Sequence, residues 1–163
     1  MGITAPELLL PQHAVVDFRS SEPTLDEWLK RKAFKKQTMG ASRTFVVCES
    51  GGNQVIGFYA LATGSIQRQS VSGALRRKLR RNMPDSLPVL VLGRLAVDER
   101  YHRRGIGAGL LKDAVLRSRL VAEQVGTKAL LVHALSEEAK AFYLHWGFTP
   151  SEIQPITLVL PLW

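Results

Sequence analysis

The sequence has very little cysteine: Cys48 is the single cysteine among 163 residues. It cannot form a disulfide within the chain, and its place in the apolar run RTFVVCES favours a buried strand residue over a nucleophile. The four histidines have no metal-ligand spacing with cysteines or carboxylates. We therefore expect neither a disulfide scaffold nor a metal site.

Long hydrophobic runs are also absent. No apolar stretch approaches the roughly 18 residues that a membrane-spanning helix needs. The N-terminal MGITAPELLLPQHAVVDF lacks the basic start and long apolar core of a secretory signal. We therefore predict a cytoplasmic protein without a membrane segment, and its length predicts one domain over residues 1–163.

Acidic residues are scarce in one third of the chain. From Lys30 to Pro84 there are 12 Lys or Arg residues and one acid, Glu49, whereas the remainder has 10 basic and 13 acidic residues. This third therefore accounts for the whole net charge of +8. Most of the excess lies in two clusters, KRKAFKK (30–36) and LRRKLRR (75–81). They are either solvated helix faces or the binding surface for a polyanion such as RNA, DNA or an acidic protein.

Hydrophobic periodicity and turn residues predict alternating helices and strands. We expect a helix capped by Thr24 and ending near Gly40, a hairpin of RTFVVCES and QVIGFYALATGSI around GGN, and a loop over 67–85 that could contain a short helix. The strand PVLVLGRLAVD precedes a helix over 107–124, followed by the strand KALLVHAL, the helix SEEAKAFYLHWG and one or two strands in FTPSEIQPITLVLPLW. With a first strand near the N-terminus, this order predicts an α/β fold around a mixed, mostly antiparallel sheet flanked by helices.

A glycine-rich stretch, YHRRGIGAGLL, joins the long strand to its helix. Backbone N–H groups at a helix start and the helix dipole favour an anion such as a pyrophosphate, and glycines let it approach closely. Arg103 and Arg104 add positive charge. The alternative is a helix entry that only packs closely on the strand. Neither a P-loop nor a dinucleotide fingerprint matches the spacing.

Two motifs together resemble a known family. LGRLAVDERYHRRGIGAGLLKDAV, followed by LVHALSEEAKAFYLHWGF, is similar to the acetyl-CoA signature of the GNAT superfamily of N-acetyltransferases. The resemblance implies acetyl-CoA as acetyl donor, Tyr143 as general acid, and a backbone of Leu95, Ala96 and Val97 that aligns the pantetheine arm. It implies further cofactor contacts at His102, Arg103, Arg104, Gly105, Gly107, Ala108, Gly109, Ser136 and Phe142. Aligned on Gly105 and Gly107, the chain has His102 at the usual Gln/Arg position, whereas Arg104, Gly107 and Gly109 also fit the pattern. Which amides hold the pyrophosphate therefore stays open.

Within the superfamily the chain looks closest to acetyltransferase toxins of bacterial toxin–antitoxin pairs, which acetylate the α-amino group of aminoacyl-tRNA and stop translation. The matching segments include LDEWLKRKAFKKQ, GFYALATGSI, RRNMPDSLPV and VHALSEEAKAFY. The resemblance implies a homodimer and a ribbon-helix-helix antitoxin whose complex binds operator DNA. We expect phosphate contacts from Lys30, Lys32, Lys35, Lys36, Arg76, Arg77, Lys78, Arg80 and Arg81.

Two questions about the reaction stay open. The strand PVLVLGRLAV has no obvious general base, which favours an α-amine over a lysine, although Asp98, Glu99 or a water chain could serve. A histidine at a position such as His133 is more often a satisfied strand residue than a base, and the alternative role of Ser136 is that of a helix cap alone. Two alternative functions are acetylation of a small amine or a protein N-terminus without tRNA, and a non-enzymatic module with a degenerate cofactor site whose basic surface binds nucleic acid.

Overall fold

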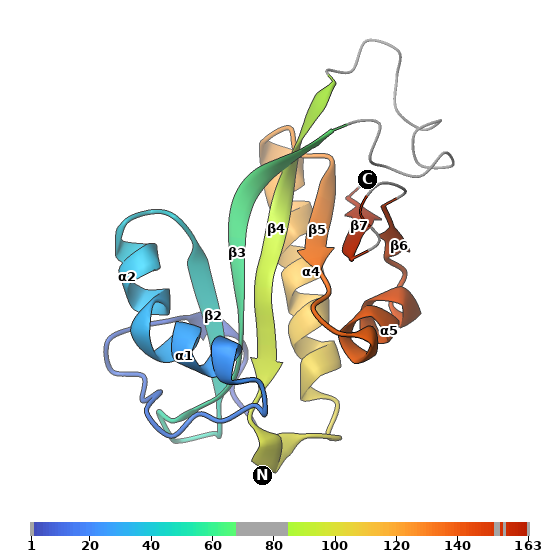
Figure 1. Ribbon diagram of the computed structural model, residues 1–163. Coiled ribbons are helices and arrows are strands. Elements are labelled where there is room, and N and C mark those ends of the chain that lie inside the picture. The colour runs from blue at the N-terminus through green and yellow to red at the C-terminus, as the bar shows by residue number, and fades with distance from the viewer. Residues whose placement is uncertain (1, 68–84, 152–153, 155, 163) are drawn as a thin grey trace. The chain divides into compact units, whose positions relative to one another are not determined.

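The computed structural model describes residues 2–67, 85–151, 154 and 156–162 of the chain (Figure 1). The described chain divides into two compact units. The first consists of Met1–Ala62 and Gly93–Ala114, and the second of Thr63–Leu92 and Val115–Trp163. Two long strands and one long helix contribute residues to both units.

The first unit contains a small antiparallel sheet with helices on its faces. Strand β2 (Arg43–Cys48) pairs with β3 (Val55–Gln67) and with the short β1 (Glu7–Leu8). The register of β2 on β3 places Arg43 opposite Leu61. Its elements are β1 (Glu7–Leu8), α1 (Pro23–Arg31), α2 (Ala33–Thr38), β2 (Arg43–Cys48), most of β3 (Val55–Gln67), the end of β4 (Ser86–Val97), the 3₁₀-helix η2 (Glu99–Tyr101) and the first turns of α4 (Ile106–Gln124).

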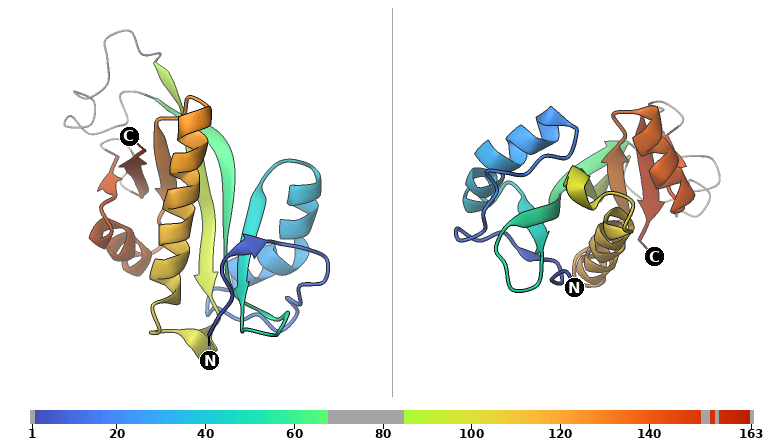
Figure 2. Two further views of the ribbon diagram at one scale, coloured as in Figure 1. Left: turned by 180° about the vertical axis from the view of Figure 1, so that it is seen from behind. Right: turned by 90° about the horizontal axis from the view of Figure 1, so that it is seen from below.

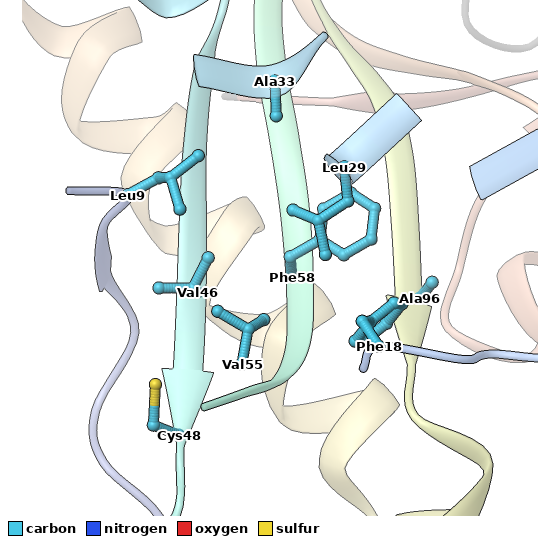
Figure 3. Packing of buried hydrophobic residues seen from close by; sticks show 9 residues of the cluster. All are labelled: Leu9, Phe18, Leu29, Ala33, Val46, Cys48, Val55, Phe58 and Ala96. Carbon is cyan, nitrogen blue, oxygen red and sulfur yellow. The ribbon is translucent and has the colours of Figure 1, made fainter. Parts of the chain in front are cut away.

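Side chains alternate between the two faces of β3 in this unit. Phe58 points into a buried apolar cluster with Leu29 of α1 and Ala96 of β4, as Figure 3 shows. Its neighbour Gly57 lies on the opposite face, where an added Cβ would meet side chains of Leu110 and Val47 at 3.1 Å. The absence of a side chain at Gly57 thus lets α4 approach the sheet closely.

The second unit is built around a parallel strand pair. β4 pairs with β5 (Ala129–His133) from Val89 to Leu92, and β5 pairs antiparallel with β7 (Thr157–Pro161). The short β6 (Thr149–Pro150) lies on the outer edge of β7, and α5 (Glu137–His145) contacts β7 (Figures 1 and 2). Its buried cluster includes Leu87, Leu131 and Val159.

The strands follow the order β1-β2-β3-β4-β5-β7-β6 in one seven-stranded sheet. It is mixed because β4 and β5 are parallel, whereas β1–β2, β2–β3, β5–β7 and β6–β7 are antiparallel. The predicted α/β fold with a mixed, mostly antiparallel sheet is confirmed. The hairpin around GGN is also confirmed, and Cys48 is buried in β2.

Two expectations about the first helix were wrong. Thr24 is not its cap, because α1 begins at Pro23 after Glu22, and proline suits the first helical position. The single helix to Gly40 is instead two helices that meet at Lys32, whose φ of −120° departs from helical geometry. In the described ranges, no helix has the length and apolar character needed to cross a membrane.

Candidate active site

The glycine-rich loop connects β4 to α4 within the first unit. After η2, the chain takes positive φ at Arg103 (65°) and Gly105 (77°), and α4 starts at Ile106. A positive φ costs glycine little, whereas it is uncommon for other residues. These two turns redirect the chain from the strand end into the helix.

The first turn of α4 leaves backbone amides without carbonyl partners in the helix. Gly109 donates its N–H to the carbonyl of Gly105 at 3.0 Å, so the intrahelical ladder begins there. The unpaired amides of the first turn are therefore those of Ile106, Gly107 and Ala108. This geometry favours the alignment on Gly105 and Gly107, with His102 at the usual Gln/Arg position.

Positive charge surrounds these amides. Arg103 and Arg104 are exposed, and the guanidinium of Arg104 lies 5.1 Å from the ring centroid of Tyr101. Tyr101 in turn donates its hydroxyl hydrogen to the carboxylate of Glu49. Unpaired amides, a helix N-terminus and two arginines fit a pyrophosphate, as the anionic part of acetyl-CoA requires.

The end of β4 brings His102 and the predicted pantetheine-aligning backbone together. Leu95 and Val97 are half-buried, Ala96 is buried, and all three lie beyond the register with β5, which ends at Leu92. His102 donates from Nε2 to the carbonyl of Val97 at 2.7 Å, since a carbonyl can only accept. His102 therefore fixes the strand end, a role that the spacing alone did not indicate.

Asp98 is a structural carboxylate in this arrangement. It is fully buried, and its oxygens accept from the Arg19 amide and from the amide and guanidinium of Arg100. Burial acts to raise the pKa of Asp98, but the hydrogen bonds from Arg100 and Arg19 together lower it. A carboxylate engaged in this way is a poor general base, so this candidate base is set aside.

Sequence reasoning missed Arg94, which stands in the apolar run of β4. Its guanidinium lies 4.8 Å from the ring centroid of Trp28 in α1, and Trp28 stacks on Phe58 at 6.1 Å with an interplanar angle of 10°. The signal that could have revealed it is a lone arginine within PVLVLGRLAV. Its aromatic partner could not have been found by spacing, because it lies in a distant segment.

The second unit places Tyr143 on α5. The residue is 7% exposed, and Phe142 and Phe148 contact its ring edge-on with centroids 5.2 and 5.4 Å away. No residue in the described part of the chain hydrogen-bonds its hydroxyl. Burial raises the pKa of Tyr143 well above its ordinary value of 10.0, so the phenol keeps its proton at physiological pH.

Three further residues of this unit have defined surroundings. Ser136 caps α5, because its Oγ accepts the amide of Ala139 at 3.0 Å. Phe142 is half-buried beside Tyr143. His133 lies 3.0 Å through Nδ1 from the hydroxyl of Thr157, which is the contact of a satisfied strand residue.

The first basic cluster forms an exposed face on α1 and α2. None of its predicted phosphate-binding lysines forms an ion pair with a described residue. These exposed residues are Lys30, Lys32, Lys35 and Lys36. The predicted contacts of the second cluster, Arg76, Arg77, Lys78, Arg80 and Arg81, lie outside the described residues.

Comparison with known sequences gives two informative relatives. The chain is 44% identical over 159 residues to a tRNA-acetylating toxin of Mycobacterium tuberculosis (strain ATCC 25618 / H37Rv), covering 98% of this chain and 92% of the relative. It is 31% identical over 147 residues to a probable toxin TacT of Sinorhizobium fredii (strain NBRC 101917 / NGR234), covering 85% of this chain and 79% of the relative.

Solved structures of similar fold include AtaT complexed with acetyl-methionyl-tRNAfMet, with a TM-score of 0.89, 26% identity, and coverage of 98% of this chain and 95% of that one. A mutant AtaT bound to acetyl-CoA and the C-terminus of the antitoxin AtaR has a TM-score of 0.82, 25% identity and coverage of 98% and 93%. The AtaT–AtaR complex bound to DNA has a TM-score of 0.76, 25% identity and coverage of 99% and 95%.

The model of the acetyltransferase (GNAT) domain matches residues 41–150. The match spans the β2–β3 hairpin, the glycine-rich loop and the helix of Tyr143, which are the segments that build the features above. The chain therefore belongs to the GNAT family of acetyltransferases, enzymes that take their acetyl group from acetyl-CoA.

Proposed function

We propose that this protein transfers the acetyl group of acetyl-CoA to the α-amino group of an aminoacyl-tRNA and thereby blocks translation. The observation that carries the proposal is the 44% identity, over 98% of the chain, to a toxin named for acetylating tRNA. The exposed lysine face on α1 and α2 supports an RNA substrate, because cations that replace phosphate counterions attract nucleic acid independently of sequence.

Each unit contributes a separate part of the chemistry. In the first unit, the pyrophosphate of acetyl-CoA is bound by the amides of Ile106, Gly107 and Ala108. The side chains of Arg103 and Arg104 add positive charge to this site. The backbone of Leu95 to Val97 aligns the pantetheine arm of acetyl-CoA. In the second unit, Tyr143 holds a phenolic proton and Phe142 packs beside it. Ser136 contributes as the cap of their helix.

The proton balance of the reaction gives Tyr143 its role. The amine forms a C–N bond to the acetyl carbon and loses one proton, while the C–S bond breaks and the departing thiolate gains one. Tyr143 donates its phenolic proton to the thiolate, and the proton released by the amine restores the phenol through water. An α-amine, with a pKa of about 7.7 to 8.0, is already partly neutral at physiological pH, so it needs little help from a base.

Partners follow from the same proposal. We infer a homodimer, and a ribbon-helix-helix antitoxin whose complex with this protein binds operator DNA. The solved structures of AtaT with the antitoxin AtaR, and of the AtaT–AtaR complex bound to DNA, support the antitoxin and DNA parts of this proposal. We also infer that residues 1–163 form one catalytic domain, because β3, β4 and α4 run through both units, and that it acts in the cytoplasm, where aminoacyl-tRNA is found.

The test uses the purified full chain, labelled acetyl-CoA and bulk tRNA, charged or uncharged, with Tyr143→Phe alongside. We expect label on charged tRNA only, and a roughly 10²- to 10⁴-fold lower turnover in the mutant with acetyl-CoA binding retained, because only the proton donor is removed. The control is Trp146→Phe, which changes an exposed aromatic residue directly after the helix of Tyr143. Label on small amines or protein N-termini but on no tRNA would disprove the proposal.

A further inference from the structure

Arg94 has no acidic partner among the residues that the structure describes. Its side chain is half-buried, and its one hydrogen bond among the described residues runs from Nη1 to the adjacent Gly93 carbonyl at 3.4 Å. Arg31 and Arg100, by contrast, pair with Glu27 and Asp98. Burial lowers the pKa of Arg94, but an arginine starts so high that the guanidinium stays charged. A partly buried cation whose N–H donors lack partners costs free energy unless an anion binds to it.

The surroundings of Arg94 hold it in a fixed orientation. The guanidinium carbon of Arg94 lies over the ring of Trp28, 4.8 Å from its centroid, and Trp28 stacks on Phe58, which is fully buried in the core cluster (Figure 3 shows Phe58). A guanidinium has five N–H donors, and its contact with the aromatic ring leaves donors available for a ligand. Such a pre-oriented fork suits the two oxygens of a phosphate.

Its place on β4 relates it to the reaction. Arg94 immediately precedes Leu95, where the backbone proposed to align the acetyl arm begins. Because side chains alternate along a strand, Arg94 and Ala96 share the face that contacts the α1 cluster. The exposed lysines of α1 and α2 belong to this same unit. The unit thus combines a basic helix surface with a guanidinium beside the backbone of the reaction site.

We propose that Arg94 binds a backbone phosphate near the charged 3′ end of the acceptor RNA, with Trp28 orienting its guanidinium. This inference rests on the proposed function and specifies how the acceptor is held. The amino acid of an aminoacyl-tRNA is esterified and has no free carboxylate, so the phosphodiesters next to it are the nearest anions that the acceptor offers. Arg94 is in these terms a substrate-binding residue that sets the position of the amine.

The test compares acceptors with and without phosphate. Wild type, Arg94→Gln, Arg94→Lys and the control Arg119→Gln, which removes an exposed arginine of α4, are assayed on charged tRNA, an aminoacyl-CCA trinucleotide and an aminoacyl-adenosine analogue without phosphate. We expect Arg94→Gln to lower kcat/KM about 10- to 100-fold on the first two acceptors, mainly through KM, with rates within about twofold of wild type on the third. Arg94→Lys keeps the charge but loses the fork, so its loss is smaller.

Two controls keep the outcomes distinct. Thermal unfolding and acetyl-CoA binding of each variant establish that the fold and the cofactor site are intact. If Arg94→Gln does not fold, Arg94→Lys replaces it as the test variant. An equal loss on the phosphate-free acceptor, a loss of acetyl-CoA binding, or unchanged rates on the trinucleotide would overturn the assignment of Arg94 while leaving tRNA acetylation in place. If the wild-type protein labels no charged tRNA, the proposed function is wrong, and this inference fails with it.

Discussion

The carboxylate of Asp98 shows how one residue joins distant segments of the first unit. Its oxygens accept hydrogen bonds from Arg19, in the N-terminal segment, and from Arg100 in η2, directly before the glycine-rich loop. The adjoining backbone continues the link, since Glu99 donates its amide to the carbonyl of Arg19 at 2.8 Å. Asp98 therefore fixes the start of the loop through ionic hydrogen bonds.

Asp98→Asn is expected to lower the free energy of unfolding by about 2 kcal/mol, because it leaves buried donors imperfectly matched. The pKa of Asp98 is lowered in the folded state, so its contribution is fully present above the unfolded value of about 3.8 and is lost as pH falls through the lower folded value. The stability difference between wild type and mutant should thus shrink as pH falls from 6 toward 2. Urea unfolding across this range measures it, with the exposed Glu123→Gln as control; a difference that stays constant with pH would contradict the ionic role.

At the scale of elements, the junction of the glycine-rich loop with α4 decides where an anion can bind. Gly105 stands outside the helix with positive φ, whereas Gly109 lies in the helix and donates to the Gly105 carbonyl. An added Cβ would meet nothing within 4 Å at either glycine. The two positions therefore differ in backbone conformation and not in crowding.

A matched pair of substitutions tests this junction. Gly105→Ala should destabilise the protein by about 1 kcal/mol and weaken acetyl-CoA binding, because alanine disfavours positive φ and the turn that presents the amides would shift. Gly109→Ala should raise the free energy of unfolding by about 0.5 to 1 kcal/mol, because alanine is the better helix former. Thermal unfolding and acetyl-CoA titration of both variants supply the measurements. Destabilisation by Gly109→Ala would refute the assigned helix start.

At the scale of the whole molecule, basic residues are concentrated in one third of the chain. In the described residues of that third, the lysines of α1 and α2 are exposed and lack acidic partners. Acidic residues in the described ranges therefore do not neutralise this surface, which suits a polyanion.

The double variant Lys32→Gln/Lys36→Gln should weaken tRNA binding and reduce the slope of log K against log salt by about 1.5 to 2, the amount expected for two lost phosphate contacts. The control Lys112→Gln/Arg119→Gln removes the same charge from exposed positions of α4. Filter binding at several salt concentrations yields the slopes. Equal slopes for the two double variants would show that the α1–α2 face does not contact RNA.

Local patterns in the sequence were sufficient for the fold class, the glycine-rich motif before α4 and the place of Tyr143 on a helix. Alternation in β2 and β3, the cap at Ser136 and the glycine before α4 are all set by residues close together in the chain, so their structure follows from short-range sterics and hydrogen bonding. The similarity to GNAT enzymes then indicated an acetyl-CoA-dependent function, because the two motifs that carry the similarity lie on these locally determined elements.

Only the tertiary structure decided those contacts and conformations that depend on segments far apart in the sequence. The division of the first helix at Lys32, the hydrogen bond from Arg19 to the buried Asp98, and the contact of Arg94 with Trp28 could not be derived from spacing. The same carboxylate or guanidinium is a solvated surface group, a structural tie or a ligand-binding residue, depending on which distant side chain reaches it. The sequence by itself determined the elements and the chemical groups available to them, and only the packing of remote segments determined which of those groups are buried, paired or left with donors to bind a substrate.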